Sequence, residues 1–243
     1  MDSDLRIAIG EKAVPVVINR RKKARYLRLR LNYRNQVAVS APWHCSNQKA
    51  LCFVEKHREW LEQQVARVPG IQTIRQWLIR HPYISAYGDR FSVCIESSSR
   101  SLMRAGYKVN REKKEVVFDT PENQKDSDVV FLRLIRSFAK EVITGRLEYH
   151  VRRLNLKFKR LGIRDQVSRW GSCSASGNIS LNWRLILIEP ELQDYVILHE
   201  LAHLTEMNHS YRFRMLLDQY DSNRVAHEAA LSSITAEVMR VGR

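Results

Sequence analysis

The sequence predicts an α+β fold, in which a β-rich N-terminal portion with one helix precedes a mainly helical region that contains a β-ribbon. Apolar and polar residues alternate in several short segments of the first half, and apolar residues recur every three or four positions later in the chain. A polar, acidic stretch at residues 120–128 marks the expected boundary. We therefore divide the chain into residues 1–120 and 121–243. No internal repeat is evident in the sequence.

The N-terminal portion begins with a predicted hairpin and a helix. Leucines alternate with arginines over residues 27–31, valines alternate with small residues over 37–40, and a polar turn joins the two segments. Apolar residues at helical spacing predict a helix over residues 47–65, and Trp60 beside them is expected to lie in the core. The same alternation predicts further strands, at residues 91–95, 107–109 and 116–118.

The C-terminal region is predicted to begin with a long amphipathic helix that includes residues 129–142. A β-ribbon should follow, with strands at residues 166–169 and 178–183. The next helix is expected to run from Pro190, which suits a first helical position, to about residue 207. Asn208 would then be a left-handed C-cap, and Ser210 can cap a following helix.

This last helix carries an H-E-x-x-H motif at residues 199–203. His199 and His203 are four residues apart, so they lie one turn above each other and both imidazoles can reach one metal ion. His209 lies beyond the predicted end of the helix and can return as a third ligand. The motif therefore predicts a metal site with three histidine ligands.

Three protein ligands and one open position are typical of catalytic zinc, which lowers the pKa of its water to about 7 and polarises a carbonyl group. Glu200 is rotated about 100° from the neighbouring histidine, so it would lie beside the metal and act as general base. Asp218 and Glu228 remain alternatives to His209 as the third ligand, because carboxylates also bind zinc.

Two other residues near the motif have candidate roles. Tyr195 lies one helical turn before the first histidine and could donate a hydrogen bond to an oxyanion, although a core position is the ordinary alternative. Cys173 could be a nucleophile or a metal switch, but no group that would lower the pKa of its thiol is evident, so a packed thiol is the simpler interpretation.

Several short motifs surround these residues. They are R-W-G-S-C at 169–173, N-I-S-L-N-W-R-L at 178–185, D-Y-V at 194–196, H-E-L-A-H-L at 199–204 and N-H-S at 208–210. Together they closely resemble the YgjP-like zinc metallopeptidase family, which looks like a minimal zincin related to SprT-type and gluzincin-like peptidases. The resemblance implies a zincin-like catalytic region with the same three histidines as zinc ligands and Glu200 as the base. The sequence departs from the family after His209, where Phe213 is followed by Arg214 in place of tryptophan.

The sequence thus predicts a zinc-dependent hydrolase, most simply a metallopeptidase with a peptide or protein substrate. Zincins commonly align an extended peptide against a strand near the metal, and residues 178–183 are the candidate strand. A metal-dependent nucleotide pyrophosphatase is the leading alternative, although the chain has no glycine-rich phosphate loop. A basic nucleic-acid-binding protein with a non-catalytic zinc is a third interpretation.

The charge balance is the reason for that third interpretation. The chain has 41 Lys and Arg against 26 Asp and Glu, a net charge of +15, and the densest basic cluster spans residues 20–30. Such a surface attracts polyanions, so association with nucleic acid is one prediction, and an ordinary solvated charged face is the other.

The sequence also indicates a location. Residues 1–4 include acidic side chains where a signal peptide has basic ones, and no apolar core segment follows. No stretch approaches the roughly 18 apolar residues that a membrane helix requires. The four cysteines form no C-x-x-C pair, which favours a reducing compartment. The expected location is the cytoplasm, without a membrane anchor.

Overall fold

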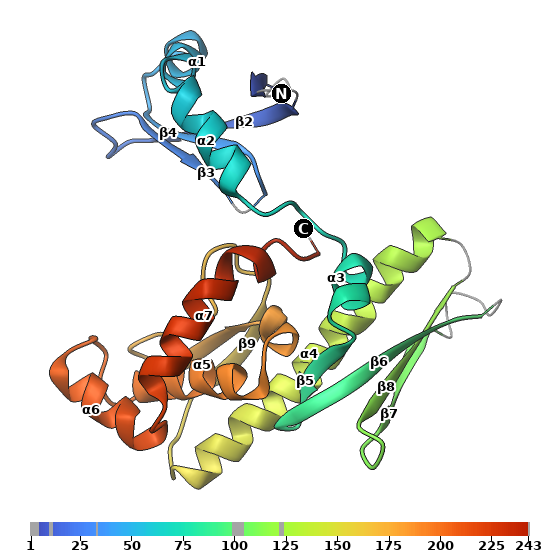
Figure 1. Ribbon diagram of the computed structural model, residues 1–243. Coiled ribbons are helices and arrows are strands. Elements are labelled where there is room, and N and C mark those ends of the chain that lie inside the picture. Colours follow the sequence, from blue (N-terminus) through green and yellow to red (C-terminus); the bar gives the residue numbers. More distant parts are fainter. Residues whose placement is uncertain (1–4, 10–11, 33, 99–104, 122–123, 243) are drawn as a thin grey trace. The chain divides into compact units, whose positions relative to one another are not determined.

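The computed structural model describes residues 5–9, 12–32, 34–98, 105–121 and 124–242 (Figure 1). The acidic N-terminal residues 1–4 and residues 122–123 of the predicted boundary lie outside this part. Two compact units make up the chain, Met1–Ile71 with Arg243 and Gln72–Gly242. The predicted α+β class is confirmed. The division falls at residue 71 rather than near 120, because the elements on either side of the predicted boundary, β8 and α4, pack together in the second unit.

The first unit is a four-stranded sheet with two helices. Its strands are β1 (Arg6–Ile9), β2 (Lys12–Arg21), β3 (Arg28–Leu31) and β4 (Val37–Pro42), in the order β1-β2-β4-β3. The predicted hairpin is confirmed, since β3 pairs antiparallel with β4 and Leu29 lies opposite Val39. The central pair, β2 and β4, is parallel.

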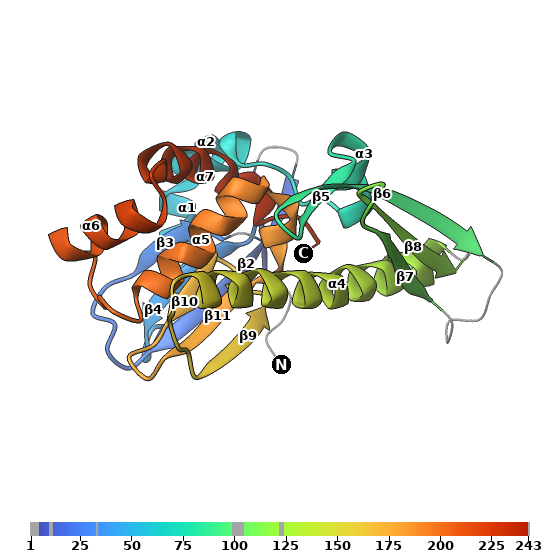
Figure 2. The same ribbon diagram turned by 90° about the horizontal axis from the view of Figure 1, so that it is seen from below.

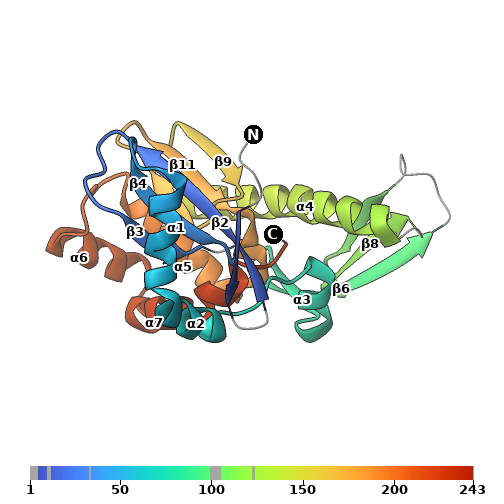
Figure 3. The same ribbon diagram turned by 90° about the horizontal axis from the view of Figure 1, so that it is seen from above.

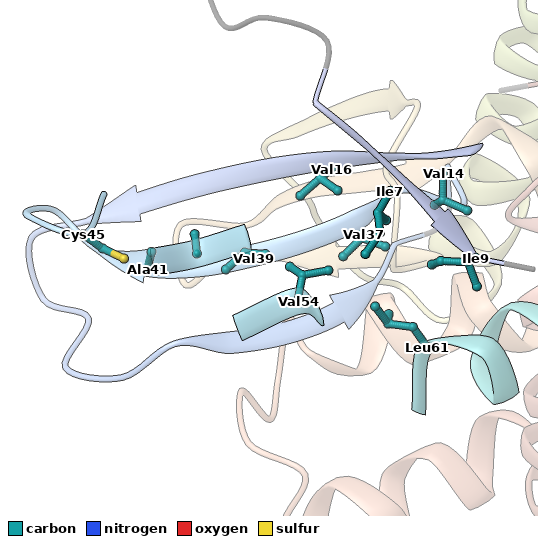
Figure 4. Close-up of a cluster of buried hydrophobic side chains, with 11 residues drawn as sticks. Ile7, Ile9, Val14, Val16, Val37, Val39, Ala41, Cys45, Val54 and Leu61 are labelled. Carbon is teal, nitrogen blue, oxygen red and sulfur yellow. The ribbon is translucent and has the colours of Figure 1, made fainter. Parts of the chain in front are cut away.

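The predicted helix at 47–65 is two helices, α1 (Asn47–Lys56) and α2 (Arg58–Arg67), because the chain breaks at His57. Their apolar faces cover one side of the sheet, where Val54 and Leu61 meet valines and isoleucines of the strands (Figure 4). The expectation for Trp60 was wrong: the side chain is 40% exposed, because it precedes Leu61 by one position and so turns away from the sheet.

The second unit begins with α3 (Ile74–Arg80) and a second four-stranded sheet. Its strands are β5 (Tyr83–Ala86), β6 (Asp89–Ser98), β7 (Gly106–Asn110) and β8 (Glu115–Pro121), which confirms the three predicted strands. The order β5-β6-β8-β7 and the directions of pairing repeat those of the first sheet. The two sheets therefore share one topology, although no repeat is evident in the sequence.

Helix α4 (Gln124–Arg153) connects this sheet to the rest of the unit. It packs against β8 and also against the 3₁₀ helix η2 (Trp183–Leu187), and Figure 2 shows it running from the four-stranded sheet towards the region of α5. No helix among the described residues combines the length and the apolar character that a membrane crossing would need.

A three-stranded sheet precedes the motif helix. It has the order β10-β11-β9, with β9 at Arg160–Arg164, β10 at Gly171–Cys173 and β11 at Asn178–Asn182. Residues 166–169, predicted as a strand, form none; the ribbon partner of β11 is β10, which begins where Gly171 pairs with Leu181. The helices α5 (Pro190–Ala202), α6 (Tyr211–Tyr220) and α7 (Arg224–Val238) complete the unit.

Candidate metal centre

The position of α5 is fixed by burial and by its start. Pro190 occupies the first turn as predicted, and almost every residue of the helix is buried, including Leu198 before the motif and Leu201 within it. Gln193, fully buried, donates a hydrogen bond to the Leu185 carbonyl at 3.0 Å, which ties the helix to η2. The motif therefore lies on a helix that packing holds from several sides.

The helix ends earlier than predicted. Its last residue is Ala202, and a tight turn follows in which the Leu204 and Thr205 amides donate to carbonyls three residues back, each at 3.0 Å. Asn208 lies beyond this turn and does not have the left-handed backbone expected of a C-cap. Ser210 does cap α6, since its hydroxyl accepts from the Phe213 amide. The turn and this cap bring the chain back towards the motif.

The three histidines named from the sequence lie together. One nitrogen from each of His199, His203 and His209 lies within 4.8 Å of the others, and the two Nε2 atoms of His199 and His209 are 3.1 Å apart. Nitrogens on a tetrahedral zinc ion would be about 3.3 Å apart, from the usual zinc–nitrogen length. In the described part of the chain, this is the one group of three or more His, Cys, Asp or Glu side chains whose ligand atoms lie close enough to hold one metal ion.

The protonation state of these imidazoles suits a metal. Burial, and then the neighbouring His203 and His209, lower the pKa of His199 to about 4. Burial also lowers the pKa of His203. Histidine binds a metal in its neutral form, so the pocket favours that form near neutral pH. The donor set therefore fits a zinc ion.

Two contacts that the sequence analysis missed orient the ligands. His203 Nδ1 lies 3.0 Å from the Glu206 carbonyl oxygen, so Nδ1 carries the hydrogen and Nε2 is left for the metal. The ring of Phe213 lies 4.6–5.0 Å from the rings of all three histidines. Two features of the sequence could have indicated these contacts. Glu206 follows His203 by three residues, and Phe213 is an aromatic residue in the first turn of α6.

Glu200 lies in an apolar and closely fitted position. It is 6% exposed, its Oε2 has no hydrogen-bond partner among the described residues, and burial raises its pKa to about 7 against the opposing charge of Arg169. Gly171 of β10 provides the space, because a Cβ atom there would lie 2.5 Å from Oε1 of Glu200. The sequence analysis named Gly171 only as part of the R-W-G-S-C motif. Its role depends on the contact between β10 and α5, which the sequence does not reveal.

Tyr195 shares two cavities with His199. The first, of about 330 Å³, is lined also by Gly171 and Glu200, and the second, of about 350 Å³, by His209. Tyr195 is 5% exposed, and burial together with the charge of the carboxylate Glu228 raises the pKa of its hydroxyl to about 12. The hydroxyl is therefore protonated at neutral pH and able to donate.

The alternative third ligands are engaged elsewhere. Arg224 Nε lies 2.6 Å from Asp218 Oδ1, and Arg224 Nη1 lies 3.3 Å from Glu228 Oε2. Cys173 is partly buried, and burial followed by the charge of Glu200 raises the pKa of its thiol. A raised pKa keeps the thiol protonated, which agrees with the interpretation of Cys173 as an unactivated residue.

The predicted substrate strand is not a free edge. Strand β11 pairs with β10 on one side and with β9 on the other, so its backbone groups are used in both directions. The two edge strands are β10 and β9, and β10 contacts α5. The sequence predicted the strand at 178–183 but placed its ribbon partner at 166–169 instead of 171–173. It also took the inner strand for the one that aligns a substrate, because a period of two does not reveal which strand has a second neighbour.

A helix with two histidines one turn apart, a third returning from a loop and a buried acid between them defines a site of the metallopeptidase class. The family model of the YgjP-like, metallopeptidase domain matches residues 25–233. The chain therefore belongs to the YgjP-like metallopeptidase family. No curated protein matches the sequence. Among solved structures, the metallopeptidase zymogen of Pyrococcus abyssi abylysin is 22% identical, with a TM-score of 0.34, over 38% of this chain and 95% of that chain.

Proposed function

We propose that the protein is a zinc-dependent metallopeptidase in which His199, His203 and His209 bind the ion and Glu200 is the general base. The observation that carries the proposal is the convergence of three imidazole nitrogens within 4.8 Å beside a buried carboxylate. Neutral nitrogen donors without a fourth protein ligand are typical of catalytic rather than structural zinc.

Zinc on three histidines supplies a Lewis acid that lowers the pKa of water and polarises a carbonyl group. Glu200 accepts the proton that the attacking water loses and later donates it to the nitrogen of the leaving amine. Its pKa of about 7 suits a group that must both accept and donate near neutral pH. The positive charge of Arg169 favours the ionised form of Glu200, which is the form that accepts the proton.

Tyr195 is proposed to bind the carbonyl oxygen as that oxygen gains negative charge. Its hydroxyl group belongs to a side chain that lines both cavities beside His199, and its raised pKa keeps the donor proton in place. A donor fixed in an apolar cavity stabilises an oxyanion more strongly than one in water.

The free edge of β10 is proposed to align the substrate. An extended peptide added to this edge would lie beside the residue that makes room for Glu200, since Gly171 begins the strand. Addition to an edge uses main-chain hydrogen bonds, so it gives affinity with little dependence on substrate sequence. This arrangement replaces the predicted use of residues 178–183.

One observation favours the second candidate, hydrolysis of a phosphoanhydride. Arg169 and Arg214 line the two cavities that include His199, and both would attract an anionic substrate. The same metal and the same base could activate water for attack on phosphorus. The family assignment favours the peptide bond, and the experiment below separates the two.

The test is Glu200→Gln, measured for zinc content and for turnover of casein, a peptide library and nucleoside triphosphates. We expect one zinc per chain to be retained and turnover to fall by about 10²- to 10⁴-fold, the usual contribution of a general base. Glu191→Gln, an exposed acid at the start of the same helix, is the matched control and should keep full activity. Full activity in Glu200→Gln would contradict the mechanism. Cleavage of triphosphates but not of peptides would contradict the peptidase assignment.

A further inference from the structure

The sheet of the first unit has one face that the unit's helices do not cover. Residues paired across neighbouring strands point to the same side. Val39 of β4, paired with Leu29 and Ile18, belongs to the core under α1 and α2. The next residue, Ser40, is paired with Arg28 and Asn19, so these side chains lie on the opposite side. Figure 3 shows α1 and α2 on a single side of the strands.

This opposite side, with the turn that follows β2, forms what we call the basic face. It contains two grooves of about 320 and 350 Å³. The lining residues with a positive charge are Arg21, Lys23, Arg25, Arg28 and Arg30. The turn crosses the end of the central strand β4, because Arg21 pairs with Pro42 and Arg28 with Ser40, and this crossing gathers the charges at one end of the sheet.

The basic face has no acidic counterpart among the described residues. The acids of the first unit that the structure describes, Glu55, Glu59 and Glu62, are on the two helices of the other side. Neither groove is lined by an acid. A concave surface of one sign concentrates counterions of the other, so the charge complement of this face is a polyanion.

An exposed aromatic ring lies within the same surface. Tyr26 lines the first groove beside Arg25 and Arg28 and is 74% exposed, although a tyrosine ring normally loses much of its surface to a core. Aromatic rings beside a positive groove are the means by which proteins hold unpaired bases, which stack on the ring while arginines bind the phosphates. Paired bases offer no free face to such a ring.

We propose that the basic face of the first unit binds single-stranded nucleic acid, with the arginines on the phosphates and Tyr26 stacked on a base. The proposal is independent of the metal site, since none of its residues lies in the second unit. It gives the chain a second function, which brings the hydrolase to a nucleic acid.

The test uses the full-length protein and labelled 20-nucleotide oligo(dT) and oligo(U), followed by fluorescence anisotropy. Five phosphate contacts predict that log K falls with log salt at a slope of about −3.5, or roughly 100-fold weaker binding between 50 and 200 mM salt. The double variant Arg28→Gln/Arg30→Gln should weaken binding at 50 mM by at least about tenfold and reduce the slope to about −2. Both side chains are exposed, so the fold should be unaffected, as a thermal melt will show.

The matched control is Lys56→Gln/Arg67→Gln, which removes the same charge from the helices on the other side. We expect this control to change affinity less than threefold. An equal loss in the two double variants would overturn the proposal, because it would show attraction by the net charge of +15 rather than by one face.

Tyr26 separates nucleic acid from other polyanions. Tyr26→Ala should weaken binding of the single strands about tenfold, the effect of losing one stacked base, whereas Tyr26→Phe should retain it. Binding of inorganic polyphosphate should not respond to Tyr26→Ala. Unchanged binding of single strands by Tyr26→Ala, or equally tight binding of a duplex of the same length, would each contradict the proposal.

Discussion

The close fit between Gly171 and Glu200 allows a test that leaves every functional group in place. A Cβ atom on Gly171 would lie 2.5, 2.6 and 2.7 Å from Oε1, Cγ and Cδ of Glu200. The glycine does not have a left-handed backbone, so alanine can adopt its conformation and the change acts only through this contact. Gly171→Ala therefore displaces the proposed base without removing it.

The size of the displacement follows from these distances. Carbon atoms pack at about 3.5 Å, so the side chain of Glu200 must move by about 0.9 Å to accommodate the methyl group. A misplacement of about 1 Å in a reacting group costs about 10²-fold, or about 2.7 kcal/mol of transition-state stabilisation. The three atoms nearest to the added Cβ all belong to Glu200, so zinc content should remain at one ion per chain.

Peptide hydrolysis by Gly171→Ala is measured beside that of Gly145→Ala. Gly145 is the matched control, since a Cβ atom there meets nothing within 4 Å and alanine favours the helix. We expect kcat/KM to fall about 100-fold in the first variant and to stay unchanged in the second.

A double variant decides whether the loss acts through Glu200. If Gly171→Ala only displaces the base, it should add little to the loss in Glu200→Gln, because the two changes remove one function. Wild-type activity in Gly171→Ala, or losses that simply add in the double variant, would refute this account of the site.

Three further predictions concern residues around the same helix. Tyr195→Phe should lower kcat about 10²-fold with zinc content unchanged, as expected for loss of one oxyanion donor, and equal kcat would contradict the proposed role. Phe213→Ala should weaken zinc binding about 10- to 100-fold in a chelator competition, because its ring packs on all three imidazoles; unchanged affinity would show that the ring does not orient them. Burial alone would raise the pKa of Asp194, but hydrogen bonds from Arg146 and His150 hold it below its ordinary value of 3.8. The ionised form thus stabilises the fold above that value, and this stability is lost as the pH falls through the lower folded pKa. In urea titrations, Asp194→Asn should unfold about 3 kcal/mol more easily at pH 7 and show a smaller loss below pH 4; a pH profile parallel to that of the wild type would contradict this.

The sequence predicted those parts of the site that depend on neighbours along the chain. The spacing of His199 and His203 follows from one helical turn, and the cap at Ser210 follows from local turn chemistry. It could not predict that Gly171 makes room for Glu200, because that fit depends on how β10 packs on α5. The same limit explains two wrong expectations: that residues 178–183 would align a substrate, and that the domain boundary would lie near residue 120. Both depend on which strands pair and which elements pack together in the tertiary structure.

The two sides of the site are held in different ways, and this decides how it should be perturbed. Glu200 is buried in α5 and His199 is partly buried beside it, so a change at either residue also disturbs packing. His203 also has a structural role, since its Nδ1 donates a hydrogen bond to the Glu206 carbonyl in the turn that ends the helix. His209 is exposed and precedes the capped start of α6. Its removal should disturb the fold least of the three, so in His209→Ala a loss of activity is best attributed to loss of the proposed metal rather than to the fold.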